Sequence, residues 1–185
     1  MTKILHQDEN IPYHVARLLI LIGICGTPQN NPNKLPAIKG RTLLAKLDFF
    51  MRYPNYLEKA GNILGFSFND NQLGISSMDA INTIESRMIR YLYGPWDDIY
   101  YIAIAYMIGK GIIEPLRPSK VDLFQLTAFG KSVLSELLND IAFSDLFARG
   151  DTIYHLFNNY SGSRLKDFIY LYFTDIVNQD IGEVI

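Results

Sequence analysis

The chain has 185 residues, of which 49% are hydrophobic and 13% aromatic, so it can bury a substantial core and is not expected to be intrinsically disordered. Its formal net charge is −2, and residues 91–185 hold 12 acidic and 7 basic side chains. This acidic balance argues against simple electrostatic wrapping of a nucleic acid by the C-terminal half. At this length we expect one domain with a small appendage.

The cysteine content points to a reducing compartment. Cys25 is the one cysteine of the sequence, so no internal disulfide can form, and its apolar surroundings favour a buried thiol over a nucleophile. The first residues lack the order of a signal peptide, and the apolar run from Leu18 to Cys25 is shorter than the roughly 20 residues that a bilayer requires. We therefore expect a soluble, cytoplasmic protein with no membrane contact.

Two helices are predicted in the first third of the chain. Apolar side chains at helical spacing predict one helix from Ile11 to Cys25 and a second from Thr42 to Tyr53, joined by a proline- and asparagine-rich loop over 27–37. Pro54 ends the second helix, and Asn55 to Ala60 is expected to form one or two further helical turns.

An insertion and a third long helix are predicted next. Residues 61–75 are rich in glycine and asparagine and are expected to form an exposed loop. Ser76 or Ser77 then caps a predicted helix that runs to about Leu92, with apolar residues at helical spacing. The Gly94-Pro95 dipeptide separates this helix from the next one.

The segment from Trp96 to Ile108 is predicted to be a helix that is apolar on every side. Asp97 and Asp98 fall in its first turn, where carboxylates complement the helix dipole. The predicted core stripe is Ile99, Ile102, Ala103, Tyr106 and Met107. Because the opposite side is apolar as well, this helix must be covered all round, by the chain itself or by a partner.

A short β-hairpin follows this helix. Residues 112–116 and 121–126 are predicted strands around a Pro-Ser turn, and Pro115, which has no N–H to donate, places the first strand at an edge. Thr127 is the expected N-cap of a helix that continues to about Asp140.

The order of these elements predicts the fold class. Helices followed by a short hairpin and a further helix are typical of a winged helix, so we predict a mainly α-helical fold with a winged-helix domain over residues 11–141 and a small two-stranded wing. Residues 142–185 are predicted to be a C-terminal helical extension, with helices after Ser144 and after Ser163. The last helix has a wide apolar face that either packs on the core or lies in a partner's groove.

Six basic residues are candidates for contact with nucleic acid. They form one group near the start of the second helix and one before Gly94: Lys34, Lys39, Arg41, Lys46, Arg87 and Arg90. The first group could bind phosphates without reading sequence, although a solvated surface accounts for it better. The second group could stack on a nucleic-acid strand, although ion pairs with Asp97 and Asp98 account for it better.

The sequence contains no catalytic or metal-binding constellation. The three histidines are scattered along the chain: His6, His14 and His155. With one cysteine there is no metal-ligand spacing, and the Gly-Lys-Gly run at 109–111 is a helix end and not a phosphate-binding loop. We expect no enzymatic activity, no cofactor and no metal.

The helix before the wing is poorly suited to a DNA groove. Such a helix normally presents Arg, Lys, Asn, Gln or Ser to base edges, whereas the segment from Trp96 to Ile108 has none of these and begins with two acidic residues. We therefore predict that protein covers it. The candidate protein-contact residues are on this helix and on the last one: Trp96, Tyr100, Tyr101, Ile104, Ile108, Phe168 and Tyr172.

Four stretches carry a resemblance to a known family. They are LLILIGIC, GRTLLAKLDFFMRYPNYL, ESRMIRYLYGPWDDIYYIAIAYMIGKGIIEPL and LTAFG, which lie within roughly residues 15–140. With them the chain resembles the small middle component of bacterial ABC-three-component systems, which include Lamassu anti-phage defence operons. The resemblance implies a non-enzymatic, kleisin-like adaptor that binds an SMC/Rad50-like ATPase subunit and an effector subunit, often a nuclease, with DNA contact only through the complex or without sequence preference.

The alternative is a winged-helix transcriptional regulator that dimerises through its first and last helices. In that case Lys39, Arg41 and Arg87 would contact DNA, and binding would show a base preference and a steep dependence on salt.

Overall fold

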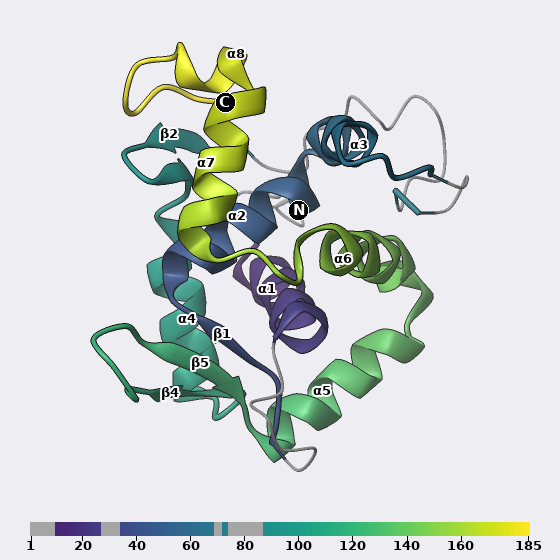
Figure 1. Cartoon of the computed structure of the whole chain (residues 1–185). Helices are drawn as coiled ribbons and strands as arrows, with labels where there is room; N and C mark the ends of the chain where they lie inside the picture. The colour runs from purple at the N-terminus through teal and green to yellow at the C-terminus, as the bar shows by residue number, and fades with distance from the viewer. Residues whose placement is uncertain (1–9, 27–33, 69–71, 74–86) are drawn as a thin grey trace, which may run out of the picture.

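The computed structural model of the chain is mainly helical, with a small antiparallel sheet (Figure 1). It describes residues 10–26, 34–68, 72–73 and 87–185. Within these residues the helices are α1 (Ile11–Cys25), α2 (Arg41–Arg52), α3 (Pro54–Ile63), α4 (Ile99–Gly109), α5 (Ala128–Asn139), α6 (Ser144–Phe157), α7 (Gly162–Tyr172) and α8 (Thr174–Val177). The strands are β1 (Ala37–Lys39), β2 (Ile89–Tyr91), β3 (Gly94–Trp96), β4 (Ile113–Leu116) and β5 (Leu123–Leu126). None of these helices is both long and apolar enough to cross a membrane.

Helix α1 lies at the centre of the molecule, packed by α2, α4, α5 and α6 (Figure 1). It begins after Asn10, whose side chain accepts a hydrogen bond from the Tyr13 amide (3.2 Å), and it ends at Gly26. Every residue from Leu18 to Ile22 is fully buried, which requires neighbours on all sides of the helix. The predicted bounds of this helix are confirmed.

The three-stranded sheet has the order β1-β5-β4, and both pairings are antiparallel. Ile38 of β1 lies opposite Phe124 of β5, and β4 forms an edge that accommodates Pro115, as predicted. β4 and β5 confirm the predicted hairpin. β1 was not predicted, because a strand of three residues is too short to show an alternating pattern.

Helix α5 begins as predicted. The Thr127 hydroxyl accepts a hydrogen bond from the Gly130 amide (2.9 Å) and donates to the Gly111 carbonyl (2.6 Å), so one side chain caps α5 and ties it to the end of α4. Gly130 is required for close packing, because a Cβ at this position would lie 2.0 Å from the Ile112 carbonyl oxygen.

A second hairpin, formed by β2 and β3, begins in a segment that was predicted to be helical. β2 and β3 pair with Arg90 opposite Pro95, and the chain turns between them at Leu92 and Tyr93. Gly94, whose φ is 116°, begins β3. The predicted helix to about Leu92 is therefore wrong at its end, and its remainder, from the expected cap at Ser76 or Ser77 to residue 86, lies outside the described residues. Apolar residues at helical spacing had suggested a helix, but tertiary pairing of short strands decided the conformation.

The helix predicted from Trp96 begins three residues later. Trp96 is the last residue of β3, and α4 begins at Ile99, whose amide donates to the Asp97 carboxylate (2.9 Å). The buried side chains of α4 are Tyr100, Ala103, Ile104 and Met107. The predicted stripe was wrong at Ile102 and Tyr106, which are 57% and 41% exposed, because a helix that is apolar all round shows no preferred face.

Two predicted boundaries also shift. α3 continues to Ile63, into the loop predicted over 61–75, and residues 64–68 then have no helix or strand. The C-terminal helix is divided at Phe173 into α7 and α8, and it is Ser161, not Ser163, that caps α7 by accepting from the Arg164 amide (3.2 Å).

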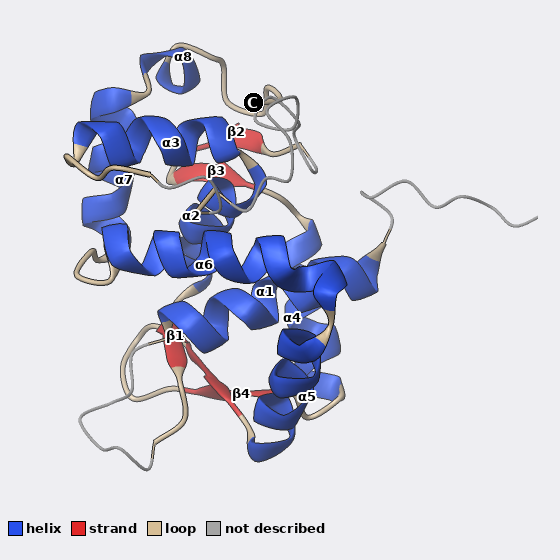
Figure 2. Ribbon diagram, turned by 90° about the vertical axis from the view of Figure 1, so that its right-hand side faces the viewer, coloured by secondary structure: helices blue, strands red, loops and turns tan. Residues whose placement is uncertain are grey.

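The C-terminal extension packs back on the chain. α6 and α7 both contact α2, and Phe168, Ile169 and Phe173 are buried against it. The last residues continue this packing, since the Ile185 amide donates to the Met88 carbonyl (2.8 Å) beside β2. Figure 2 shows the result: β1, β4 and β5 lie at one end of the molecule, β2 and β3 lie near the other, and α1 and α6 cross between them.

A buried ion network joins α1, α2 and α4. The Asp48 carboxylate of α2 accepts from Arg17 Nε of α1 (2.6 Å), from Arg52 Nε of the same helix (2.8 Å) and from the Tyr100 hydroxyl of α4 (2.8 Å). Arg52 Nη1 donates in turn to Asp97 (2.6 Å) at the start of α4. The side chains of Arg17, Asp48 and Arg52 are fully buried.

The network also fixes the state of His14. Arg17 Nη2 lies 2.8 Å from His14 Nδ1, and because a guanidinium can only donate, Nδ1 must accept and the ring carries its proton on Nε2. Burial, followed by the charge of Arg17, lowers the pKa of His14. His14 is therefore neutral in the folded chain.

We predict that Asp48→Ala is strongly destabilising. It leaves Arg17 buried without a carboxylate and Arg52 with Asp97 alone, so we expect the free energy of unfolding to fall by about 3–5 kcal/mol in urea denaturation. The control is Arg117→Gln at the surface pair of Arg117 and Asp122 (2.6 Å), where Arg117 is 79% exposed and the expected change is below about 1 kcal/mol. Equal changes in the two variants would contradict this account.

We also predict that stability decreases in acid in two steps. Folding favours the unprotonated form of His14, so its contribution to the free energy of unfolding is fully present above about pH 6.5. Below that pH the unfolded chain takes up a proton at His14, and this contribution decreases. Burial alone would raise the pKa of Asp48, but Arg17 and Arg52 lower it to about 2, so its contribution is lost between about pH 4 and 2. Urea midpoints measured against pH test this, and His14→Gln should remove only the first step.

Candidate functional site

One face of α4 is apolar and uncovered. Four large hydrophobic side chains on it are more than a third exposed: Tyr101, Ile102, Tyr106 and Ile108. The opposite face is held in the core by Tyr100, which bonds to Asp48, and by Met107. The buried network therefore determines which side of this uniformly apolar helix faces outward.

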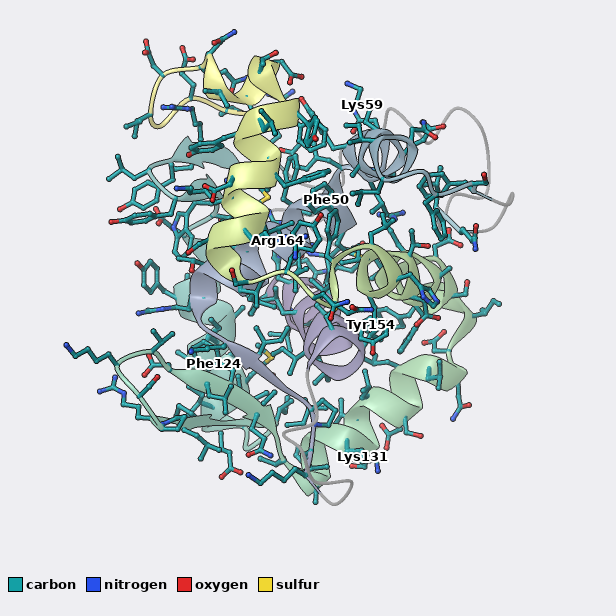
Figure 3. All side chains as sticks on the ribbon, in the orientation of Figure 1. Phe50, Lys59, Phe124, Lys131, Tyr154 and Arg164 are labelled. Atoms are coloured by element: carbon teal, nitrogen blue, oxygen red, sulfur yellow. The ribbon has the colours of Figure 1, made fainter. Side chains whose placement is uncertain are left out.

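A groove runs between this face and the β4–β5 hairpin, and we call it the α4–β4 groove. Its volume is about 600 Å³. Its apolar lining comes from both elements: Tyr101, Ile104, Ala105, Ile108, Pro115 and Phe124. Arg41, Arg117 and Asp122 complete it, and Phe124 is labelled in Figure 3. Of the two arginines, Arg117 forms an ion pair with Asp122. Arg41 has no carboxylate within ion-pair distance among the described residues.

A second pocket, the aromatic pocket, adjoins this groove at the start of α2 and has a volume of about 350 Å³. Its rings come from the β2–β3 hairpin and from α4: Tyr91, Tyr93, Trp96 and Tyr101. The Arg41 guanidinium lies 5.2 Å from the centre of the Tyr101 ring, in the range of a cation–π contact. The Trp96 indole donates to Asp98 (3.1 Å), which orients its ring.

A third pocket, the lysine pocket, lies where α2 and α7 begin and has a volume of about 550 Å³. Lys39 of β1, Lys46 of α2 and Lys166 of α7 line it. Its other lining residues are Thr42, Tyr93, Val121, Ser161, Gly162 and Ser163. The aromatic pocket shares residues with both neighbours, so the three form one continuous surface.

The structure divides the predicted protein-contact residues into two groups. Tyr101, Ile108 and Tyr172 are 53%, 37% and 47% exposed. The other four are buried in the chain's own core: Trp96, Tyr100, Ile104 and Phe168. Of these four, Ile104 still lines the α4–β4 groove and Trp96 the aromatic pocket, whereas Tyr100 and Phe168 line none of the three pockets and are covered by intramolecular packing.

The six basic candidates are not one patch. Lys34, Lys39 and Arg41 are exposed, as is Arg87. Lys46 is 2% exposed, and its ammonium group donates to the Thr42 carbonyl (3.0 Å).

Arg90 lies on strand β2, so it does not share a helix with Arg87 as predicted. The predicted ion pairs of Arg87 and Arg90 with Asp97 and Asp98 are also wrong. Asp97 pairs with Arg52, which sequence spacing could not indicate because 45 residues separate the two.

The sequence analysis did not identify several residues that line the aromatic pocket and the lysine pocket. Tyr91 and Tyr93 were assigned to the end of a helix, and they lie instead on and after β2, next to Trp96. Lys166 and Ser163 reach Lys39 only because α7 folds back on α2. Local pattern carries no signal for such long-range packing.

The described residues offer little for nucleophilic or metal chemistry. Burial, followed by the charge of Asp151, raises the pKa of the Cys25 thiol to about 12, so it is not a reactive thiolate. Among the residues that the structure describes, no three His, Cys, Asp or Glu side chains gather as metal ligands would.

Comparisons of this chain with models of protein families, with curated proteins and with solved structures find no match.

Proposed function

We propose that the chain is a non-enzymatic winged-helix adaptor subunit of a bacterial anti-phage defence complex of the ABC-three-component (Lamassu) type. In this role it joins an SMC/Rad50-like ATPase to an effector nuclease. The uncovered apolar face of α4 is the observation that carries the proposal, and the resemblance of the sequence supplies the class of partner.

The order of helices and strands along the chain supports the winged-helix part of the proposal. α1, β1, α2, α4, β4 and β5 occur in this order in the chain, and α4 contacts β4, so the β4–β5 hairpin lies beside α4. In a winged helix the recognition helix comes directly before the wing, so α4 has the position of the recognition helix and β4–β5 that of the wing. α3 and the β2–β3 hairpin are then additions between α2 and α4.

The side chains of α4 support a protein partner over a DNA groove. Its sequence, IYYIAIAYMIG, contains no basic or amide side chain that could read base edges. Its exposed residues are aromatic and aliphatic, and a contiguous exposed patch of this kind marks a protein-binding site more often than a nucleic-acid site.

The α4–β4 groove defines the chemistry of its occupant. Ile108, Pro115 and Phe124 favour apolar side chains, and Arg41, which has no ion pair with another residue that the structure describes, favours a carboxylate. We propose that an amphipathic segment of the ATPase subunit, apolar on one side and acidic at its end, occupies this groove.

The DNA-binding regulator remains the second candidate because Lys39 and Arg41 are both exposed beside the start of α2. In that reading these two side chains bind backbone phosphates, and α4 contributes no base contact.

We predict that Ile108→Glu weakens binding to the ATPase encoded next to this protein by at least tenfold, about 1.4 kcal/mol, because a carboxylate would replace an apolar contact in the groove. The measurement is biolayer interferometry with the purified ATPase subunit. The stability of the variant should match that of the original chain, since Ile108 is already 37% exposed.

Leu138→Glu is the matched control, because Leu138 is a 62% exposed aliphatic residue on α5, outside the groove. We expect it to bind normally. If both variants bind the ATPase as the original chain does, the groove is not the docking site. If the original chain does not bind the ATPase but binds duplex DNA with a base preference, and Lys39→Gln abolishes this binding, the chain is a DNA-binding regulator.

A further inference from the structure

The first turns of α2 and α7 lie against each other at the lysine pocket. A Cβ at Gly162, in the first turn of α7, would be 3.7 Å from the backbone nitrogen of Leu43, in the first turn of α2. The first turn of α2 follows Gly40 and has no side-chain cap. Backbone N–H groups and the positive ends of two helix dipoles therefore face the same region.

Three ammonium groups add to this positive potential. Lys39 is exposed, Lys166 is half-buried, and Lys46 is almost fully buried. The carboxylate of Asp167 lies 3.3 Å from Lys166 Nζ and offsets part of the charge, but it does not line the pocket. The lining itself carries three cations and no acidic side chain.

Lys46 is the unusual member of this group. Its stem passes beneath the β2–β3 hairpin, where a Cβ at Gly94 would lie 3.3 Å from Lys46 Cε. Its ammonium group donates to the Thr42 carbonyl, and no carboxylate lies within ion-pair distance of it among the described residues. A buried cation without a counter-ion is costly, so such a group normally has a bound partner or a function.

The electrostatics of Lys46 agree with this geometry. Burial, followed by the charge of Lys166, lowers its pKa to about 8. A bound anion would remove the repulsion between the two ammonium groups.

We propose that the lysine pocket binds a phosphate group, supplied either as inorganic phosphate or as the phosphate monoester of a nucleotide. This proposal is independent of the proposed adaptor function. Lys46 and Lys166 contribute charge, the first turns of α2 and α7 contribute N–H donors, and Thr42 and Ser163 contribute hydroxyl groups. A phosphate oxygen can accept bonds from all of these donor types.

The size of the pocket is compatible with both sources. Its volume of about 550 Å³ is larger than a phosphate ion. The exposed ring of Tyr93 lines both this pocket and the aromatic pocket. A nucleoside attached to the phosphate would reach these rings, on which a base can stack.

The test is isothermal titration calorimetry of the full chain with inorganic phosphate, AMP and adenosine at constant ionic strength. We expect saturable binding of phosphate and of AMP, and none of adenosine. Tighter binding of AMP than of phosphate identifies the nucleotide as the source, and equal binding identifies the free ion. Absence of saturation by both phosphate and AMP up to roughly 10 mM, or binding of adenosine equal to that of AMP, overturns the proposal.

Two variants separate binding from folding. Lys46→Met keeps the buried stem and removes the charge, so we expect at least tenfold weaker phosphate binding together with an unchanged or raised Tm. Ser163→Asp places a carboxylate in the exposed first turn of α7, which favours the helix but repels an anion, so phosphate binding should be lost while Tm is maintained.

The matched control is Lys131→Met, an exposed lysine on α5 that lies far from Arg164 and the start of α7 (Figure 3). We expect the control to bind phosphate as the original chain does. Normal binding by both Lys46→Met and Ser163→Asp, or a loss in the control equal to theirs, overturns the assignment of the site.

Discussion

The Asp48 carboxylate is the interaction on which the rest of the structure depends. It lies between two buried guanidinium groups and also accepts a hydrogen bond from the Tyr100 hydroxyl, so one side chain joins α1, α2 and α4. A buried charge is stable only when its partners neutralise it and satisfy its hydrogen bonds, and this arrangement does both for Asp48. The helices that meet there cannot rotate without breaking the network, whereas purely apolar helices could pack in several ways.

The orientation of α4 follows from this constraint. The helix is apolar on all sides, so the hydrophobic effect alone does not select the face that is buried. Tyr100 and Asp97 attach one side of the helix to α2, and the opposite side, with Tyr101, Ile102 and Tyr106, is thereby exposed beside β4 and β5. The exposed apolar face of α4 is therefore a consequence of the buried polar contacts.

Local sequence signals predicted the parts of the fold that local physics determines. The bounds of α1, the β4–β5 hairpin, the edge position of Pro115 and the cap at Thr127 all depend on residues close together in the chain, and all are confirmed. The β2–β3 hairpin and the face of α4 were predicted wrongly, because each depends on packing against distant segments. The candidate surface was predicted in part: Tyr101 and Ile108 are exposed, but the contribution of Tyr93 depends on the β2–β3 hairpin and that of Lys166 on the packing of α7 against α2.

Hydrogen–deuterium exchange of the chain, alone and with either the proposed ATPase partner or duplex DNA, measures directly which molecule covers α4. The account predicts that amides in the segments from Ile99 to Gly109 and from Ile113 to Leu126 exchange more slowly when the ATPase is added and at an unchanged rate with DNA. Slower exchange of these segments with duplex DNA, and no change with the ATPase, would contradict it.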